Sequence, residues 1–147
     1  MDKEKEDIIF GDFPDLFPTG REPSPDTLMY YGFACRNGWY KHVYNLCYDV
    51  KKIAKRDNLT IVVEQVKEKF GGLRFYCRGA NQAVHNIIRE YETESVKICE
   101  VCGAPGEYRN DLSWIQTLCD QHDRETREQK RHNYIAKWNS MRGRKIA

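Results

Sequence analysis

Two pairs of potential metal ligands, separated by sixteen residues, constrain the fold of this chain more than any other feature of its sequence. Cys99 and Cys102 form the first pair, and Cys119 and His122 form the second. Structural zinc sites use four Cys or His ligands in a tetrahedron, commonly as two pairs that are each held by a tight local turn. We therefore predict that these four residues bind one zinc ion and that their segment folds around it.

The residues between and after the two pairs predict the shape of this zinc module. Gly103 follows the first pair, where a knuckle needs an unhindered backbone, and Pro105 with Gly106 then turns the chain. Residues 107–108 and 114–118 can pair as a short hairpin, and the acidic residues after Cys119 favour the start of a helix. This order predicts a treble-clef-like module. Four protein ligands leave no open position on the metal, so the zinc is expected to be structural.

The other three cysteines, Cys35, Cys47 and Cys77, are scattered and have no ligand spacing. Cys47 lies on the apolar side of a predicted helix and Cys77 on the core face of a predicted strand, so both are expected to be small buried apolar side chains. The N-terminus is acidic and has no apolar stretch behind it, unlike a signal peptide. No apolar run approaches the roughly 18 residues that a membrane helix needs. We therefore expect a cytoplasmic protein with no membrane partner and no disulfide framework.

Residues 28–97 predict an α+β core domain with the order αββα. Apolar positions recur at helical spacing over 39–56 and again over 81–97. Between these helices, residues 60–70 and 73–78 are expected to form two strands joined by Gly71 and Gly72, which supply the positive φ angles of a two-residue turn. The result is an antiparallel hairpin whose apolar face is covered by the two helices.

A turn at Gly71 and Gly72 also predicts which side chains share each face of the hairpin. The predicted core face carries Val62, Val66, Phe70, Leu73, Phe75 and Cys77. The opposite face includes Ile61 and Val63 and, nearer the turn, a cationic surface made of Lys67, Lys69, Arg74, Tyr76 and Arg78. Clustered positive charge of this kind suits a phosphate group or an acidic protein, and the alternative is a solvated sheet face.

The two ends of the chain differ from the core in composition. Residues 1–27 carry eight acidic and three basic groups and four of the five prolines, which predicts an extended acidic arm. Its apolar residues predict that part of this arm lies across the domain. The zinc module of residues 98–147 ends in a basic helix with one mixed face. That face carries Arg124, Arg127, Arg131, Tyr134, Ile135, Trp138, Arg142 and Lys145.

This basic helix has two interpretations. Arginines beside aromatic side chains can bind a nucleic-acid backbone or the acidic groove of a protein. Alternatively, Tyr134, Ile135 and Trp138 pack on the domain while the arginines extend to solvent. We favour the packed helix and keep Arg124, Arg127, Arg131 and Trp138 as candidate partner-binding residues.

Five segments of the chain resemble a family of small, uncharacterised bacteriophage and prophage proteins. They are FPDLFP (13–18), YGFACRNGWY (31–40), QVKEKFGGLRFY (65–76), ICEVCGAPG (98–106) and TLCDQH (117–122). The resemblance implies a phage origin and a zinc site, and carries no assigned activity. Small phage accessory proteins often act by binding a host or defence protein, so the resemblance implies such a partner, with inhibition of bacterial immunity as one outcome.

Three classes of function fit these features. The first is a non-enzymatic, zinc-stabilised protein that binds a host or defence macromolecule, either protein or nucleic acid. The second is an HNH-like nuclease, which would need a histidine base on the zinc hairpin, but residues 103–118 contain no histidine. The third is a protein that binds an anionic nucleotide on the cationic hairpin surface. We favour the first class.

Overall fold

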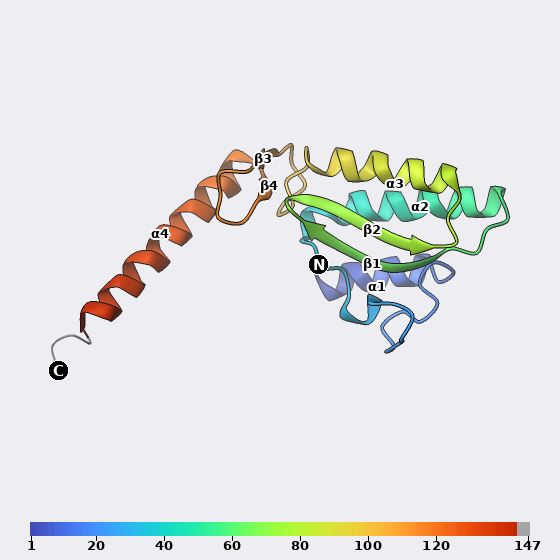
Figure 1. Cartoon of the computed structure of the whole chain (residues 1–147), viewed down its shortest axis with the longest axis horizontal. Coiled ribbons are helices and arrows are strands. Elements are labelled where there is room, and N and C mark those ends of the chain that lie inside the picture. The colour runs from blue at the N-terminus through green and yellow to red at the C-terminus, as the bar shows by residue number, and fades with distance from the viewer. Residues whose placement is uncertain (144–147) are drawn as a thin grey trace.

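The structure is a computed structural model that describes residues 1–143. The last four residues of the predicted zinc module, 144–147, lie outside the described part. Figure 1 shows a body of helices packed around a hairpin, and one long helix that projects away from this body. Among residues 1–143, no helix combines the length and the apolar composition needed to cross a membrane.

The central part of the chain has the predicted αββα order. Helix α2 (Tyr40–Arg56) precedes strands β1 (Val62–Lys69) and β2 (Gly72–Arg78), and helix α3 (Gln82–Ser95) follows. Four of the apolar positions of α2 that recur at helical spacing, Val43, Leu46, Cys47 and Val50, are buried, as amphipathic patterning requires. Helix α3 packs along α2 and beside β2 (Figure 1). The predicted α+β core is confirmed.

The turn of the β1–β2 hairpin lies one residue before its predicted position. Lys69 pairs with Gly72, so the two turn residues are Phe70 and Gly71, with φ angles of 52° and 79°. The prediction of Gly71 and Gly72 followed the local preference of glycine for positive φ. A contact of the turn explains why it lies at Phe70 and Gly71: the Thr117 hydroxyl donates to the Gly71 carbonyl at 2.7 Å. Long-range contacts thus outweigh the local preference.

This correction changes which side chains face the core. Phe70, predicted to be buried, is 64% exposed. Farther along β1 the pairing register shifts between Val63 and Gln65, which is the signature of a β-bulge. Val63 and Ile61 are therefore buried in place of Val62. The predicted core residues that are buried are Val66, Leu73 and Phe75.

Both outer edges of the hairpin have hydrogen-bond partners. Residues 28–34, which include the short 3₁₀ helix η1 (Met29–Tyr31), run along β1, where the Ala34 N–H donates to the Val66 carbonyl at 3.0 Å. On the other edge, the N–H of Phe75 donates to the Glu92 carboxylate of α3 at 2.9 Å. These contacts cover backbone groups that would otherwise pair with other chains.

The N-terminal arm is partly helical. Residues Lys3–Asp12 form helix α1, so the prediction of an extended arm is wrong for this stretch. The physical reason is that every proline of the arm follows Asp12, and the acidic residues in the first turn of α1 favour a helix there. The predicted contact with the domain is confirmed, since Ile9, Phe13, Leu16 and Phe17 are buried in the main core.

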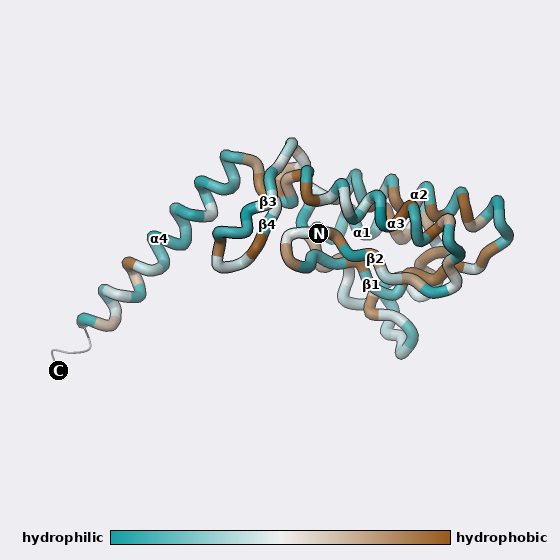
Figure 2. Tube along the Cα trace, turned by 45° about the horizontal axis from the view of Figure 1, so that its top comes forward, coloured by the Kyte–Doolittle hydropathy of each residue, from teal (hydrophilic) through white to brown (hydrophobic). Residues whose placement is uncertain are grey.

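The predicted zinc module has the order of elements expected from the sequence. Strands β3 (Glu107–Arg109) and β4 (Gln116–Leu118) form an antiparallel hairpin, and helix α4 (Asp120–Gly143) begins directly after Cys119. The prediction that α4 packs on the domain is wrong. Residues 131–143 are all exposed, and α4 points away from the body (Figure 1). Figure 2 shows that most of α4 is hydrophilic, whereas hydrophobic segments recur along the elements of the body.

Candidate metal centre

Four potential ligand atoms converge between the β3–β4 hairpin and the start of α4. The Sγ atoms of Cys99, Cys102 and Cys119 and a ring nitrogen of His122 all lie within 4.8 Å of one another. The Sγ atoms of Cys102 and Cys119 are 3.9 Å apart, and the Nδ1 atom of His122 lies 3.6 Å from Cys99 Sγ. This group could hold a metal ion such as zinc.

The separations match those of a tetrahedral zinc site. With Zn–S bonds of about 2.3 Å and a Zn–N bond of about 2.0 Å, a tetrahedron places two sulfurs about 3.8 Å apart and a sulfur and a nitrogen about 3.5 Å apart. The Cys102–Cys119 and Cys99–His122 distances agree with these values, and the Cys119 Sγ to His122 Nδ1 distance of 3.2 Å is slightly shorter. Three sulfurs and one imidazole also match the donor preference of zinc.

The first ligand pair is held by a tight backbone turn. The Gly103 N–H donates to the Cys99 carbonyl at 2.8 Å, and the Cys99 N–H donates to the Ala104 carbonyl at the same distance. Gly103 has a φ angle of 79°, in the left-handed region that favours glycine. These bonds form the predicted knuckle and place both Cys99 and Cys102 toward the second pair.

The second pair is positioned by the start of α4. The Asp123 N–H donates to the Cys119 carbonyl at 2.9 Å, which sets the first turn of the helix. The Nδ1 atom of His122 faces the cysteines, while its Nε2 atom lies 3.8 Å from the Glu125 carboxylate. A carboxylate near the outer nitrogen of a ligating histidine helps to orient its ring. Sequence reasoning did not single out Glu125.

The metal centre is joined to the core by contacts that sequence reasoning missed. The Gly38 N–H donates to the Glu100 carbonyl at 2.8 Å, and the indole Nε1 of buried Trp39 donates to the Ile98 carbonyl at 2.9 Å. A Cβ atom on Gly38 would overlap the carbonyl groups of Cys99 and Glu100. In the sequence, these contacts correspond to the Gly-Trp pair before α2. That pair does not indicate that residues 98–100 are its partners.

The remaining cysteines lie away from the metal centre. Cys35 and Cys47 are buried, and Cys77 is half-buried. Burial raises the pKa of Cys35 to about 12 and that of Cys77 to about 11, and it also raises the pKa of Cys47. Their thiols are therefore protonated at neutral pH and behave as small apolar side chains.

Three basic residues of the predicted cationic surface each contact a different part of the protein. Arg78 donates to the Asp26 carbonyl and also pairs with the Glu64 carboxylate, at 3.0 and 3.3 Å. Arg74 donates to the Leu73 carbonyl, and Lys69 lies over the ring of Phe70 near the turn.

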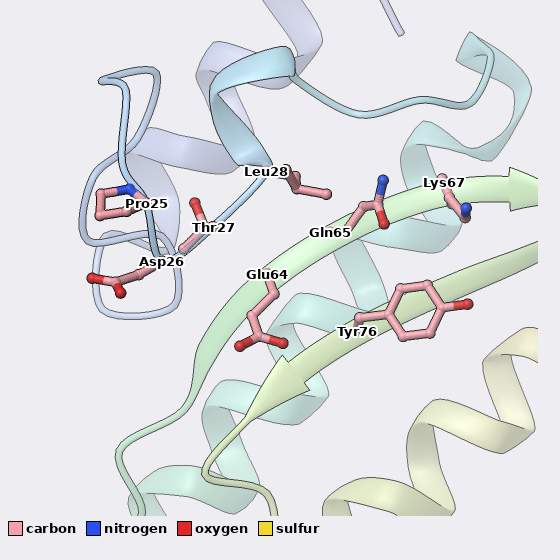
Figure 3. Close-up of a pocket in the computed structure, with 8 residues that line it drawn as sticks. All are labelled: Pro25, Asp26, Thr27, Leu28, Glu64, Gln65, Lys67 and Tyr76. Carbon is pink, nitrogen blue, oxygen red and sulfur yellow. The ribbon is translucent and has the colours of Figure 1, made fainter.

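Lys67 and Tyr76 line an open pocket of about 390 Å³ on this face (Figure 3). The acidic residues Asp26 and Glu64 line the same pocket. The five predicted residues thus share one side of the hairpin, but they do not form a single site of positive charge.

On α4, the predicted partner-binding arginines have different roles. Arg127 donates two hydrogen bonds to the Asp111 carboxylate, at 2.9 and 3.0 Å, and one to Asp123 at 2.9 Å. Lys130 donates to the Ser113 hydroxyl at 2.8 Å. These bonds attach the first half of α4 to the loop between β3 and β4. Within the described chain, Arg124, Arg131 and Trp138 are exposed.

Comparison of the chain with protein-family models, with curated proteins and with solved structures found no match. The resemblance to phage proteins therefore stays a prediction.

Proposed function

We propose that this protein is a non-enzymatic, zinc-stabilised binding protein that attaches to a macromolecular partner through residues 131–143, here named distal α4. The observation that carries this proposal is the exposure of its large side chains. Tyr134 is 71% exposed, Ile135 and Trp138 are each 47% exposed, and Met141 is 58% exposed. Apolar side chains gathered on one exposed element mark an interaction site.

The proposed role of the metal is to hold α4 in place. One zinc ion bound by Cys99, Cys102, Cys119 and His122 would have four protein ligands, which suits a structural site and leaves no position for a substrate. Cys119 and His122 lie at the start of α4, so the ion would fix the direction in which the helix leaves the body. Elemental analysis of the purified protein is expected to give about one zinc per chain.

The resemblance adds a biological setting to this proposal. A phage accessory protein in the cytoplasm of an infected bacterium would meet host proteins, defence proteins and nucleic acid. We propose a host or defence protein as the partner, with nucleic acid as the alternative. Inhibition of bacterial immunity would be one consequence of such binding.

Affinity capture from infected cells tests the proposal, using the full chain with a tag on a flexible C-terminal linker. The Arg131→Glu, Lys137→Glu double variant reverses charge on distal α4, and the Lys69→Glu, Arg74→Glu variant reverses the same charge on the hairpin. We expect only the first variant to lose the partner. Nuclease treatment before capture separates a protein partner from one held by nucleic acid. A partner retained by the distal α4 variant would contradict the proposal.

A further inference from the structure

We infer that distal α4 docks as a preformed helix into an apolar groove with acidic rims on a partner protein. This inference rests on the proposed function and specifies the chemistry of its partner. Tyr134, Trp138 and Met141 are spaced i, i+4 and i+7, so they form one stripe along the helix. This spacing is typical of the anchors with which a helix fills a hydrophobic groove.

Positive charge lies beside this stripe on both sides. Arg131 and Arg142 lie on the side of Ile135, while Lys137 lies on the other side. The Arg142 guanidinium also stacks over Trp138, 3.9 Å from the ring centroid. Residues 129–143 contain four basic and no acidic side chains. A complementary partner surface therefore has an apolar floor and negative charge along its rims.

The same pattern disfavours a second copy of this chain as the occupant. Antiparallel pairing of two distal α4 helices around Trp138 would bring their basic flanks together. Neither helix has an acidic residue in this region to compensate, so like charges would repel.

Nucleic acid fits the stripe less well than a protein groove does. Base edges and phosphates are recognised by polar and charged side chains. Here the middle of the exposed face carries Tyr134, Trp138 and Met141, and the cations lie at its flanks. Burial of Ile135 and Met141 would contribute little on a phosphate backbone, whereas an apolar groove would use both.

The base of α4 is held rigidly enough to present this stripe. Arg127 and Lys130 bind the β3–β4 loop through Asp111 and Ser113, immediately before distal α4 begins. With the metal ligands at the start of the helix, these contacts fix its direction. A partner would then meet an ordered helix, which lowers the entropy cost of binding.

Calcium-loaded calmodulin is a suitable probe, because its open apolar groove accepts basic amphipathic helices. We expect the full-length, zinc-loaded protein to bind it in isothermal titration calorimetry. Trp138→Ser should weaken binding by at least about tenfold, since it removes the central anchor. Asn139→Ala, on the opposite side of the helix, is the matched control and should leave binding unchanged. Calcium-free calmodulin, whose groove is closed, should not bind.

Three results would overturn the inference. The first is no binding to calcium-loaded calmodulin, or binding that Trp138→Ser leaves unchanged. The second is tighter binding to duplex DNA or to anionic phospholipid vesicles than to calmodulin. The third is a dimer in analytical ultracentrifugation that Trp138→Ser dissociates. The capture experiment tests the proposed function separately. Loss of the partner from the Arg131→Glu, Lys137→Glu variant would support the proposed function even if one of these three results overturned the inference.

Discussion

Gly38 lies where the core meets the metal centre, with its backbone against the chain around Cys99. Its N–H donates to the Glu100 carbonyl at 2.8 Å, and Gly103 approaches it from the knuckle. A side chain at residue 38 has no space, because a Cβ atom would overlap two backbone carbonyl groups. Backbone groups cannot move aside as a flexible side chain can, so the close approach requires glycine.

Gly38→Ala is therefore expected to lower the free energy of unfolding by about 3 kcal/mol, at the upper end for an overpacked site. The matched control is Gly11→Ala in α1, where a Cβ atom would meet no atom within 4 Å. That change should raise stability by about 0.5–1 kcal/mol, because alanine has the higher helix propensity. Chemical denaturation measures both variants. Equal effects of the two substitutions would show that the contact with the knuckle is unimportant.

Among the elements, the β1–β2 turn does not follow the local preference for glycine at positions with positive φ. Phe70 adopts a φ angle of 52°, which a side chain with a Cβ atom rarely takes. Two contacts hold the tip in this register: Glu68 accepts the Gly71 N–H at 2.7 Å, and Thr117 donates to the Gly71 carbonyl. The turn therefore stores strain that these two contacts offset.

Phe70→Asn is expected to relieve this strain, because Asn-Gly is the favoured sequence for a turn with two positive φ angles. The left-handed conformation costs most L-residues roughly 1–2 kcal/mol, and Phe70 is largely exposed, so little burial is lost. Phe70→Leu keeps the strain and serves as the control. We expect the Asn variant to be more stable than the Leu variant by about 1 kcal/mol in thermal or chemical denaturation. The reverse order would mean that Phe70 itself stabilises the tip.

Arg127 connects α4 to the β3–β4 loop, and its removal should loosen that contact. In Arg127→Ala, the amides around Asp111 should exchange hydrogen faster, since their loop loses its ion pair with the helix. Arg124→Ala removes an exposed arginine from the same helix and should leave the loop unchanged. The hydrogen bond from Arg127 lowers the pKa of Asp111. The contact is therefore present above the usual carboxyl range and weakens as the pH falls through the lowered pKa.

Features that follow from local sequence patterns could be predicted, whereas features that depend on contacts between distant segments could not. Helical periodicity and ligand spacing are local patterns, and they predicted helices α2 and α3 and the grouping of the four candidate ligands. The bulge near Glu64, the turn at Phe70 and the attachment of Gly38 depend on contacts between distant segments, which one sequence does not reveal. The direction of α4 belongs with these, because ion pairs across the zinc module set it.

For the whole molecule, the two hydrophobic clusters differ greatly in size. The main cluster joins α1, α2, α3 and the β1–β2 hairpin around buried Trp39. In the predicted zinc module, the described residues up to 143 give a second cluster with three buried members, Cys99, Leu112 and Leu118. One of these three, Cys99, is itself a candidate metal ligand. So small a core cannot fold the module by apolar burial alone, and a bound metal ion would supply the missing stability.

Metal removal should therefore unfold the zinc module and leave the main core folded. After treatment with a chelator, amides of residues 99–122 are expected to lose protection from hydrogen exchange, while those of α2 and β1 keep theirs. The Gly38 amide should show partial loss, because its hydrogen bond to the Glu100 carbonyl breaks. Re-addition of zinc should restore protection, which controls for irreversible damage. If residues 99–122 stayed protected in metal-free protein, the four ligands would form a stable cluster without an ion, and the proposed role of zinc in fixing α4 would fail.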